Sequence, residues 1–114
     1  MNSKNETKNI KDYNNLLKEA KKQHKKIFVD VYTDWCGFCK EMDETTFSNP
    51  QVKAELKKNY IIIKINGDFN KKLSEKYKIE GYPTLIVLNS NGKVIKKYTG
   101  YQVPKEFLKW LTKK

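Results

Sequence analysis

The sequence contains no arginine, so every one of its basic residues is a lysine. Because 24 basic residues face 13 acidic ones, the formal net charge is +11 at pH 7. Proteins that recognise nucleic-acid bases rely on the planar guanidinium group of arginine, and the lysines here are scattered over every predicted element. The composition therefore argues against specific nucleic-acid binding and favours a solvated, lysine-rich surface. An acidic partner or a membrane surface stays open as a secondary preference.

Long apolar runs are also missing from the sequence. No stretch reaches the ~18 apolar residues that a membrane-spanning helix needs, so no such span is predicted. Residues 1–11 are polar and lack the apolar core of a signal peptide, which as written predicts a cytoplasmic protein. A mature form whose leader was removed is the other open placement. We expect residues 1–10 to be a flexible N-terminal segment and residues 11–114 to form a single domain.

Hydrophobic periodicity predicts the order helix, strand, helix, strand, helix, strand, strand, helix. The predicted helices cover residues 11–24, 36–58 with a break near Phe47, a stretch after Asn70, and 104–112. The predicted strands cover residues 27–33, 60–66, 85–88 and 93–99, the last as an edge strand with its lysines facing outward. This order predicts an α/β fold with a mixed central sheet of about four strands and helices on both faces.

The second helical region restarts after Phe47, and two capping arrangements are open there. Asn49 can cap a helix whose first residue is Pro50, or Ser48 can form a capping box with Gln51. Either arrangement predicts two helical pieces instead of one continuous helix.

Only two cysteines are present, Cys36 and Cys39, and they stand three positions apart. A structural zinc site needs four ligands, and the only histidine, His24, is expected on the surface at the end of the first helix. A purely structural disulfide would close a very small loop and remove little entropy from the unfolded chain. The surroundings of the pair therefore favour a redox function over both alternatives, and no metal is expected.

The position of the pair at the start of a helix gives the two thiols different roles. Cys36 faces unpaired backbone N–H groups and the positive end of the helix dipole, which favour its thiolate. It would attack a substrate disulfide, and Cys39 would then attack the mixed disulfide to release the product. Gly37 is expected to let the loop turn tightly, and Trp35 offers an apolar surface to a docking peptide.

Asp30 interrupts an otherwise apolar strand. A buried carboxylate is costly unless it is neutral, hydrogen-bonded or useful, so Asp30 is a candidate to accept the proton of Cys39. Lys64, on the neighbouring strand, would modulate its charge. The alternative is that the strand lies near an edge and that Asp30 points to solvent.

The tripeptide Tyr82-Pro83-Thr84 opens a predicted strand. A cis bond at Pro83 would present a neighbouring backbone group to an extended substrate chain. Sequence alone favours the trans isomer, because cis X–Pro bonds are a small minority.

The motif from Trp35 to Lys40, taken with Asp30, Lys64, residues 82–84 and Gly100, resembles the thioredoxin fold. The similarity runs from about residue 11 to the C-terminus. It implies that Cys36 is the nucleophile, Cys39 the resolving thiol, Asp30 the buried acid, Lys64 its partner, and Pro83 a cis proline beside the disulfide. The predicted substrate-binding residues are Trp35, Gly37, Phe38, Tyr82, Pro83 and Thr84.

Three segments, 29–36, 39–42 and 46–52, resemble more closely the soluble C-terminal domain of DsbD-type thiol reductases and related small extracytoplasmic proteins. This resemblance implies a compartment outside the cytoplasm. It also implies protein thiols and disulfides as partners, with a separate upstream electron donor, because the membrane domain of the DsbD type is absent. Typical thioredoxins have a proline at the position of Phe38 and a tryptophan at the position of Tyr32. The residues between the cysteines influence the redox potential, so the direction of electron flow stays open.

We therefore expect a monomeric protein-disulfide reductase whose only redox group is the Cys36–Cys39 disulfide, with no other cofactor. An oxidant or isomerase of the same fold is one alternative. A redox-inert binding module is another, and an electrostatic binder of nucleic acid or membrane surfaces is a third.

Overall fold

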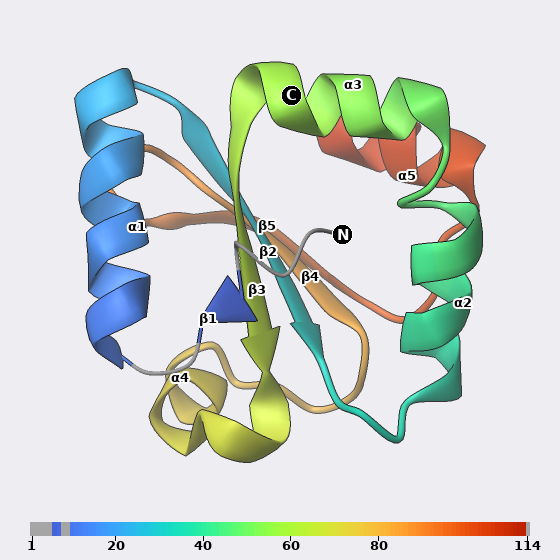
Figure 1. Ribbon diagram of the computed structural model, residues 1–114, viewed down its shortest axis with the longest axis horizontal. Helices are drawn as coiled ribbons and strands as arrows, with labels where there is room; N and C mark the ends of the chain where they lie inside the picture. The colour runs from blue at the N-terminus through green and yellow to red at the C-terminus, as the bar shows by residue number, and fades with distance from the viewer. Residues whose placement is uncertain (1–5, 8–9, 114) are drawn as a thin grey trace.

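The computed structural model describes residues 6–7 and 10–113 (Figure 1). What was expected of residues 1–5 and 8–9 therefore lies outside the described residues. The elements are β1 (Glu6–Thr7), α1 (Ile10–Gln23), β2 (Lys26–Tyr32), α2 (Gly37–Thr45), α3 (Pro50–Asn59), β3 (Tyr60–Asn66), the 3₁₀ helix η2 (Gly67–Phe69), α4 (Lys71–Lys76), β4 (Thr84–Leu88), β5 (Val94–Thr99) and α5 (Pro104–Thr112).

Within the described residues the strands form one mixed sheet in the order β1-β3-β2-β4-β5. β2 runs parallel to β3 and antiparallel to β4, and β4 pairs antiparallel with β5. The chain crosses from β2 to the parallel β3 through α2 and α3, while β4 and β5 are joined by a tight hairpin. The predicted mixed sheet, with helices on both faces, is confirmed, and β2 is its central strand.

Part of residues 1–10, the segment expected to be flexible, lies in regular elements. Glu6–Thr7 forms β1, which pairs in parallel with Lys64 and Ile65 of β3, and α1 already begins at Ile10. A two-residue strand has no readable period, and its pairing partner lies far along the sequence. This is why the sequence pattern predicted about four strands and missed this one.

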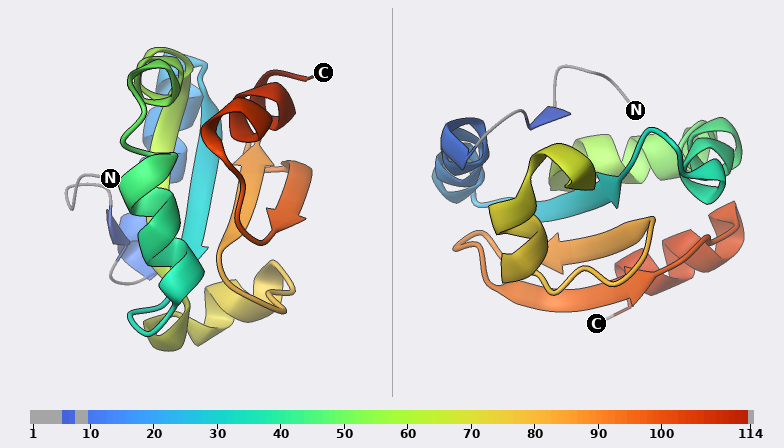
Figure 2. Two further views of the ribbon diagram at one scale, coloured as in Figure 1. Left: turned by 90° about the vertical axis from the view of Figure 1, so that its right-hand side faces the viewer. Right: turned by 90° about the horizontal axis from the view of Figure 1, so that it is seen from below.

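Two apolar cores lie on opposite faces of the sheet, because successive side chains of a strand point to opposite sides. Ile27, Val29 and Val31 of β2 face α1 and α4. Phe28, on the other face, packs with residues of α2, α3 and α5. The left view of Figure 2 looks onto that second face, with α1 behind the strands. A strand covered on both sides must be apolar on both sides, as the run Ile27–Val31 is apart from Asp30.

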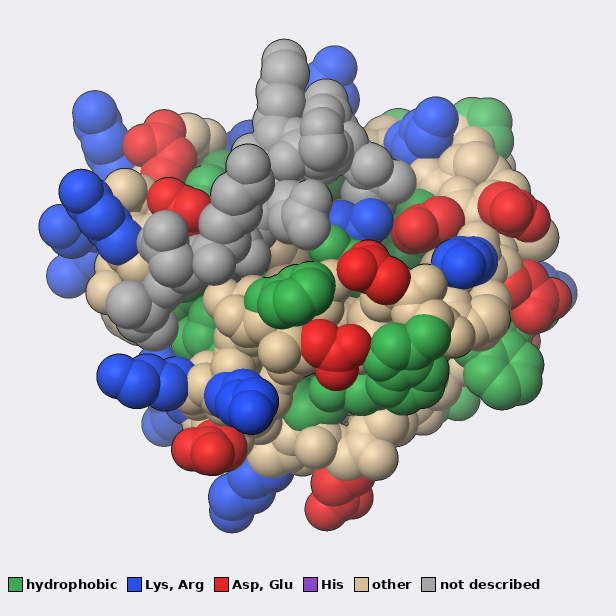
Figure 3. All heavy atoms as spheres, turned by 60° about the horizontal axis from the view of Figure 1, so that its bottom comes forward, with side chains coloured by type: hydrophobic (Ala, Val, Ile, Leu, Met, Phe, Trp, Pro, Cys, Tyr) green, Lys and Arg blue, Asp and Glu red, His purple; other side chains and the backbone are tan. Residues whose placement is uncertain are grey.

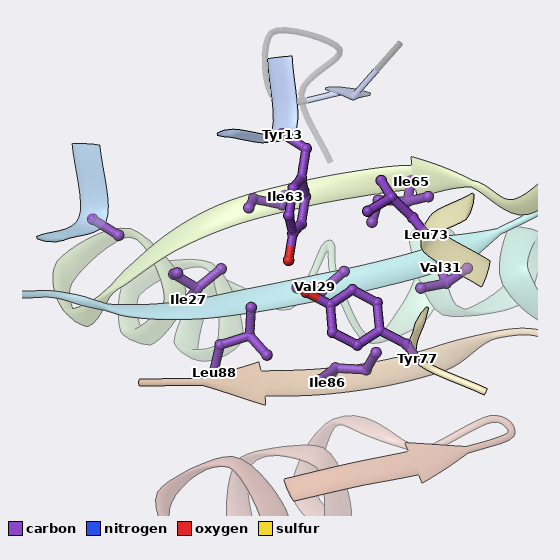
Figure 4. Close-up of a cluster of buried hydrophobic side chains, with 11 residues drawn as sticks. Tyr13, Ile27, Val29, Val31, Ile63, Ile65, Leu73, Tyr77, Ile86 and Leu88 are labelled. Atoms are coloured by element: carbon purple, nitrogen blue, oxygen red, sulfur yellow. The ribbon is translucent and has the colours of Figure 1, made fainter. Parts of the chain in front are cut away.

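The first core contains two tyrosines that meet over the centre of β2 (Figure 4). Tyr13 of α1 and Tyr77 after α4 pack edge to face, with ring centroids 6.2 Å apart. Burial raises the pKa of Tyr13 to about 12, so the phenol stays neutral at physiological pH. The second core is built on aromatic rings, since Phe28, Phe47 and Phe107 contact one another at centroid distances of 5.4–5.8 Å.

The break between α2 and α3 follows one of the two arrangements open from sequence. The side-chain oxygen of Asn49 accepts the backbone N–H groups of Gln51 and Val52 at 2.9 and 3.1 Å, with Pro50 as the first helical residue. Ser48 does not form the capping box, because its hydroxyl donates back to the carbonyls of α2. Asn49 is therefore the N-cap of α3.

Two lysines of the edge strand β5 hydrogen-bond to the ends of neighbouring helices. Lys96 donates to the carbonyls of Trp110 and Lys113 at the end of α5, and Lys97 donates to those of Tyr77 and Lys78 after α4. A cation beside the last carbonyls of a helix is favourable, so both lysines are used as helix C-terminal partners. The expectation that the lysines face outward holds for the exposed Lys93 and Lys97, whereas Lys96 is half-buried against the end of α5.

No helix in the part of the chain that the structure describes is long and apolar enough to cross a bilayer.

Replacing Asn49 by alanine tests the capping assignment. Asn49→Ala removes an acceptor for two N–H groups, and we expect it to lower the free energy of unfolding by about 1 kcal/mol. Ser48→Ala is the matched control and is expected to change stability by less than about 0.5 kcal/mol. Urea unfolding of both variants measures the difference, and a larger loss in Ser48→Ala would contradict the assignment.

Candidate active site

The site begins where β2 ends and the chain turns into α2. Cys36 is the N-cap of α2 in extended geometry, and its Sγ accepts the backbone N–H of Cys39 at 3.1 Å. The two cysteines are joined by a disulfide bond, and both are nearly buried. The prediction that the pair lies at the start of a helix is confirmed. Gly37 is the first residue of α2 and has no positive φ, so the tight turn expected of it is not required.

The face that α2 turns toward the sheet carries the second cysteine. Cys39, Met42 and Asp43 are three and four residues apart and so share one side of the helix. Met42 packs in the same core as Phe28. Because Asp30 follows Phe28 by two residues on β2, it lies on the same face of the sheet, toward α2. Asp30 and Cys39 thus lie on the facing sides of β2 and α2.

Asp30 is a buried carboxyl at the centre of the fold. Only 2% of its surface is exposed, on the central strand, so the alternative in which it points to solvent is wrong. Burial away from water raises its pKa from 3.8 to about 7, an effect that the positive charge of Lys64 reduces and the negative charge of Asp43 increases. Near neutral pH this carboxyl can therefore both take up and release a proton.

Lys64 is next to Asp30 in the sheet, but its charge is directed elsewhere. The two residues are register partners on β3 and β2. The ammonium group of Lys64 pairs with Asp43 at 3.6 Å and lies 4.6 Å from the centre of the Tyr32 ring. Lys64 therefore forms its ion pair with Asp43 and also acts on Asp30 through its field, as expected of a residue that modulates the charge of Asp30.

Trp35 links three loops that come from different parts of the chain. The ring is 68% exposed. Its Nε1–H donates to Asp68 of η2 at 2.8 Å, and its ring packs edge to face on Tyr82 at 5.7 Å. Gly67 makes room for this arrangement, since a Cβ there would lie 2.6 Å from the Tyr82 ring. The loops after β2 and β3 and before β4 therefore form one unit around the disulfide.

The Tyr82–Pro83 peptide bond is cis, the isomer that the resemblance implies. The loop is fixed on both sides of the proline. The hydroxyl of Thr84 donates to the carbonyl of Gly81 at 2.6 Å, and the backbone N–H of Gly100 donates to the carbonyl of Pro83 at 2.8 Å. Gly100 has a φ of +118°, a conformation that favours glycine.

Phe38 closes the other side of the site. Its ring is 61% exposed and lies 6.5 Å from the ring of Tyr101, the residue after Gly100. The hydroxyl of Tyr101 hydrogen-bonds that of Thr45 at 2.9 Å, which ties the loop before α5 to the end of α2. The residue that departs from the thioredoxin pattern is therefore supported by a second aromatic ring.

A search of the described residues finds no group of three or more histidine, cysteine or carboxylate side chains that could hold a metal ion. His24 lies exposed after α1, at a φ of +56°. The Cys36–Cys39 disulfide is a redox group within the described residues.

Sequence reasoning missed Asp43, Gly67, Asp68 and Tyr101. Asp43 had a usable signal, because it follows Cys39 by four residues and so shares its helical face. Asp68 and Tyr101 come from other elements, and only the folded chain brings them to Trp35 and Phe38.

The family model of the "Thioredoxin-like domain" matches residues 13–114. The chain belongs to the thioredoxin-like family. Thioredoxins also share its fold: the Drosophila melanogaster protein Deadhead superposes with a TM-score of 0.79 at 26% identity over 93% of this chain and 94% of its own. The Fasciola hepatica thioredoxin superposes with a TM-score of 0.74 at 24% identity, over 94% of this chain and 95% of its own.

The curated relatives of this thioredoxin-like chain include thiol:disulfide interchange proteins. That of Haemophilus influenzae, DsbD, is 31% identical over 112 residues, which cover 93% of this chain and 19% of the relative. DsbD of Photorhabdus laumondii is 39% identical over 75 residues, 63% of this chain and 13% of the relative. The chain thus spans less than a fifth of these relatives. It carries the Cys-x-x-Cys disulfide of a thiol-disulfide oxidoreductase.

Asp30→Asn tests the buried carboxyl through stability. The folded-state pKa of Asp30 is raised to about 7, so its contribution to stability is fully present below about pH 4 and is lost as the pH rises through 7. Asparagine cannot ionise. We compare the free energy of unfolding of Asp30→Asn with that of the wild type. As the pH rises from 4 to 9, we expect the difference to change by about 2–4 kcal/mol in favour of Asp30→Asn. Urea unfolding across this range measures it, and a pH-independent difference would contradict the assignment.

The two neighbours of Asp30 should move its pKa in opposite directions. Removing the positive charge in Lys64→Met is expected to raise the pKa of Asp30, and removing the negative charge in Asp43→Asn is expected to lower it. Titration of the Asp30 carboxyl carbon by NMR separates the two variants. Shifts of the same sign in both would rule out this electrostatic arrangement.

Proposed function

We propose that the chain is a protein-disulfide reductase that passes electrons from the dithiol form of Cys36 and Cys39 to disulfides of protein substrates. One observation carries the proposal. The Cys36–Cys39 disulfide lies at the start of α2, whose buried face is turned toward a carboxyl with a pKa of about 7. A structural disulfide would gain nothing from such a carboxyl.

The first step is the attack of the Cys36 thiolate on one sulfur of the substrate disulfide. A bond forms between Cys36 and that sulfur, the substrate S–S bond breaks, and the other substrate sulfur leaves as a thiolate. Cys36 is assigned this role because it precedes the helix, beside exposed Trp35 and Gly37. Its Sγ already accepts one N–H of the helix N-terminus, which favours the thiolate.

The second step is the attack of Cys39 on the Sγ of Cys36. The Cys36–Cys39 disulfide forms, the mixed disulfide breaks, and the second substrate sulfur leaves as a thiolate that takes up a proton. Cys39 must lose its own proton first, and the carboxylate of Asp30 accepts it, directly or through a water. Lys64 and Asp43 set how readily Asp30 does so. The protein dithiol is oxidised by two electrons and the substrate disulfide is reduced.

The residues around the disulfide would hold the substrate chain. Trp35, Phe38 and Tyr82 offer ring surfaces for side chains next to the substrate cysteine. Pro83, buried and followed by Thr84, would present a neighbouring backbone group to an extended chain. Thr84 contributes by fixing this loop to Gly81.

The charges near the cysteine pair affect its potential and hence the direction of electron flow. A strongly oxidising pair owes its potential to a well-stabilised thiolate in the reduced form. Here the direct neighbours of Cys36 are Trp35 and Gly37, the only histidine is His24, and the nearest lysine, Lys40, lies four residues further along the chain. The charge of Asp30 opposes a second negative charge nearby. These features support a reducing couple over an oxidising one.

The Cys36–Cys39 disulfide that each turnover leaves must be reduced again to the dithiol. The chain contains no third cysteine, so the electrons come from a dithiol outside this sequence. We propose a separate thiol protein as this donor, and we propose that the chain acts as a monomer.

Replacing each cysteine by serine separates the two steps. With insulin as substrate and dithiothreitol as donor, we expect Cys36→Ser to reduce insulin no faster than dithiothreitol alone. Cys39→Ser keeps the attacking thiol. Mixed with insulin after dithiothreitol has been removed, it should accumulate a mixed disulfide with the substrate, visible by mass spectrometry after acid quenching. Full activity in Cys36→Ser would exclude the mechanism, as would failure of Cys39→Ser to form any adduct.

A further inference from the structure

The disulfide is surrounded by an apolar surface that extends beyond the Cys-x-x-Cys motif. Besides Trp35 and Phe38, the ring of Phe69 is exposed, by 74%. Phe69 follows Asp68, the acceptor for the Trp35 indole, so its backbone is held next to the motif. A group of large exposed rings beside a reactive pair is typical of a docking surface.

The loop that carries Phe69 is anchored by its neighbours. The side-chain oxygen of Asn66 accepts the backbone N–H of Asp68 at 3.0 Å, and the Asn70 side chain donates to the carbonyl of Asn66 at 2.9 Å. Ser74 donates to the carbonyl of Gly67 at 3.3 Å. Phe69 is therefore presented on an ordered turn.

Charge is distributed unevenly between this surface and the rest of the protein. Residues 27–39, 65–70 and 79–92, which lie around the disulfide, contain no lysine, although Lys40 and Lys64 border them and the chain has 24 basic residues in 114. They do contain four acidic residues, among them Asp34 and Asp68. Figure 3 looks toward the end of the molecule where β2 and β3 finish. Acidic and hydrophobic side chains lie side by side there, and most lysines lie toward the margin.

Within the described residues, Asp34 and Asp68 form side-chain hydrogen bonds with neutral groups. Asp34 accepts a hydrogen bond from the neutral amide of Asn66 at 3.3 Å, and Asp68 accepts the one from Trp35. Among residues 10–113, the structure records no lysine in an ion pair with either carboxylate. Asp43 differs, since Lys64 neutralises it. Both free carboxylates are exposed and flank the exposed rings.

We propose that this surface, defined by Asp34, Trp35, Phe38, Asp68 and Phe69 and called here the docking face, binds a substrate segment that carries basic and apolar residues next to its disulfide. This inference rests on the proposed reductase function and adds the substrate class. Apolar side chains would contact the rings, and a lysine or arginine would lie near the two carboxylates.

The proposal goes against the net charge, which makes it testable. A net charge of +11 would by itself attract acidic substrates. Charges within a few ångströms outweigh distant ones, because salt screens interactions beyond a Debye length of about 8 Å at physiological ionic strength. The docking face should therefore select basic segments on a protein that is basic as a whole.

The experiment uses two peptide disulfides of the same sequence, with the residues flanking the cysteine either lysine or glutamate. The rate constant of each with the reduced protein is divided by its rate constant with dithiothreitol, which corrects for the intrinsic reactivity of the peptide. For the wild type at low salt, we expect the corrected rate with the lysine peptide to be about three- to tenfold higher. The ratio of the corrected rate with the lysine peptide to that with the glutamate peptide should fall toward one in 0.5 M salt.

Asp34→Asn/Asp68→Asn removes both charges and keeps an oxygen to accept each hydrogen bond. We expect this double variant to lose most of the preference. Glu55→Gln is the matched control: Glu55 also accepts a hydrogen bond from a neutral amide, that of Asn59, and it precedes β3 at the opposite end of the strand from Asp68. It should keep the wild-type preference.

The outcomes separate the two proposals. A corrected ratio at or below one in the wild type, or a double variant that keeps the ratio, would overturn the docking face. Equal losses in the double variant and in Glu55→Gln would also overturn it, because the effect would then follow net charge. The neutral 2-hydroxyethyl disulfide tests the chemistry alone. If the wild type reduces neither this compound nor either peptide, the proposed reductase function itself is wrong.

Discussion

The structure depends on the burial of one carboxyl, that of Asp30, in the central strand of the sheet. Removing a carboxylate from water costs several kcal/mol when nothing compensates. Burial in the fold therefore favours the neutral form of the Asp30 carboxyl. Lys64 and Asp43 then adjust the balance, one in each direction. A fold that only needed stability would place an apolar residue here. In the proposed mechanism, Asp30 accepts the proton of Cys39 on the facing helix.

Much of this could be predicted from the sequence, because the signals were local. The apolar runs gave β2, β3 and β4 nearly to the residue, and Asn49-Pro50 marked the start of α3. Asp30 was conspicuous for the same reason, as the single charge in the apolar run of residues 27–33. The position of the cysteine pair at the start of α2 followed from the end of one pattern and the beginning of another.

The remaining features depend on contacts between distant parts of the chain, which periodicity does not report. β1 exists only because β3 offers it an edge. The ion pair of Lys64 depends on how α2 crosses the sheet, and it goes to Asp43 although Asp30 is the register neighbour. Gly37 illustrates the opposite error, since the residue type suggested a turn but the position is an ordinary helix start. The lysine-free segments were readable in sequence, yet they gained meaning only when the fold gathered them around the disulfide.

The central claim is that the Cys36–Cys39 pair acts as a reductant, and its equilibrium with glutathione tests this most directly. Because no cation is directly next to Cys36 in sequence and Asp30 opposes a second negative charge, the account predicts a potential of about −270 mV, in the range of thioredoxin. Alkylation of the free thiols at a series of glutathione ratios, followed by mass spectrometry, gives the equilibrium constant. A potential more positive than about −180 mV would contradict the account and indicate an oxidant or isomerase.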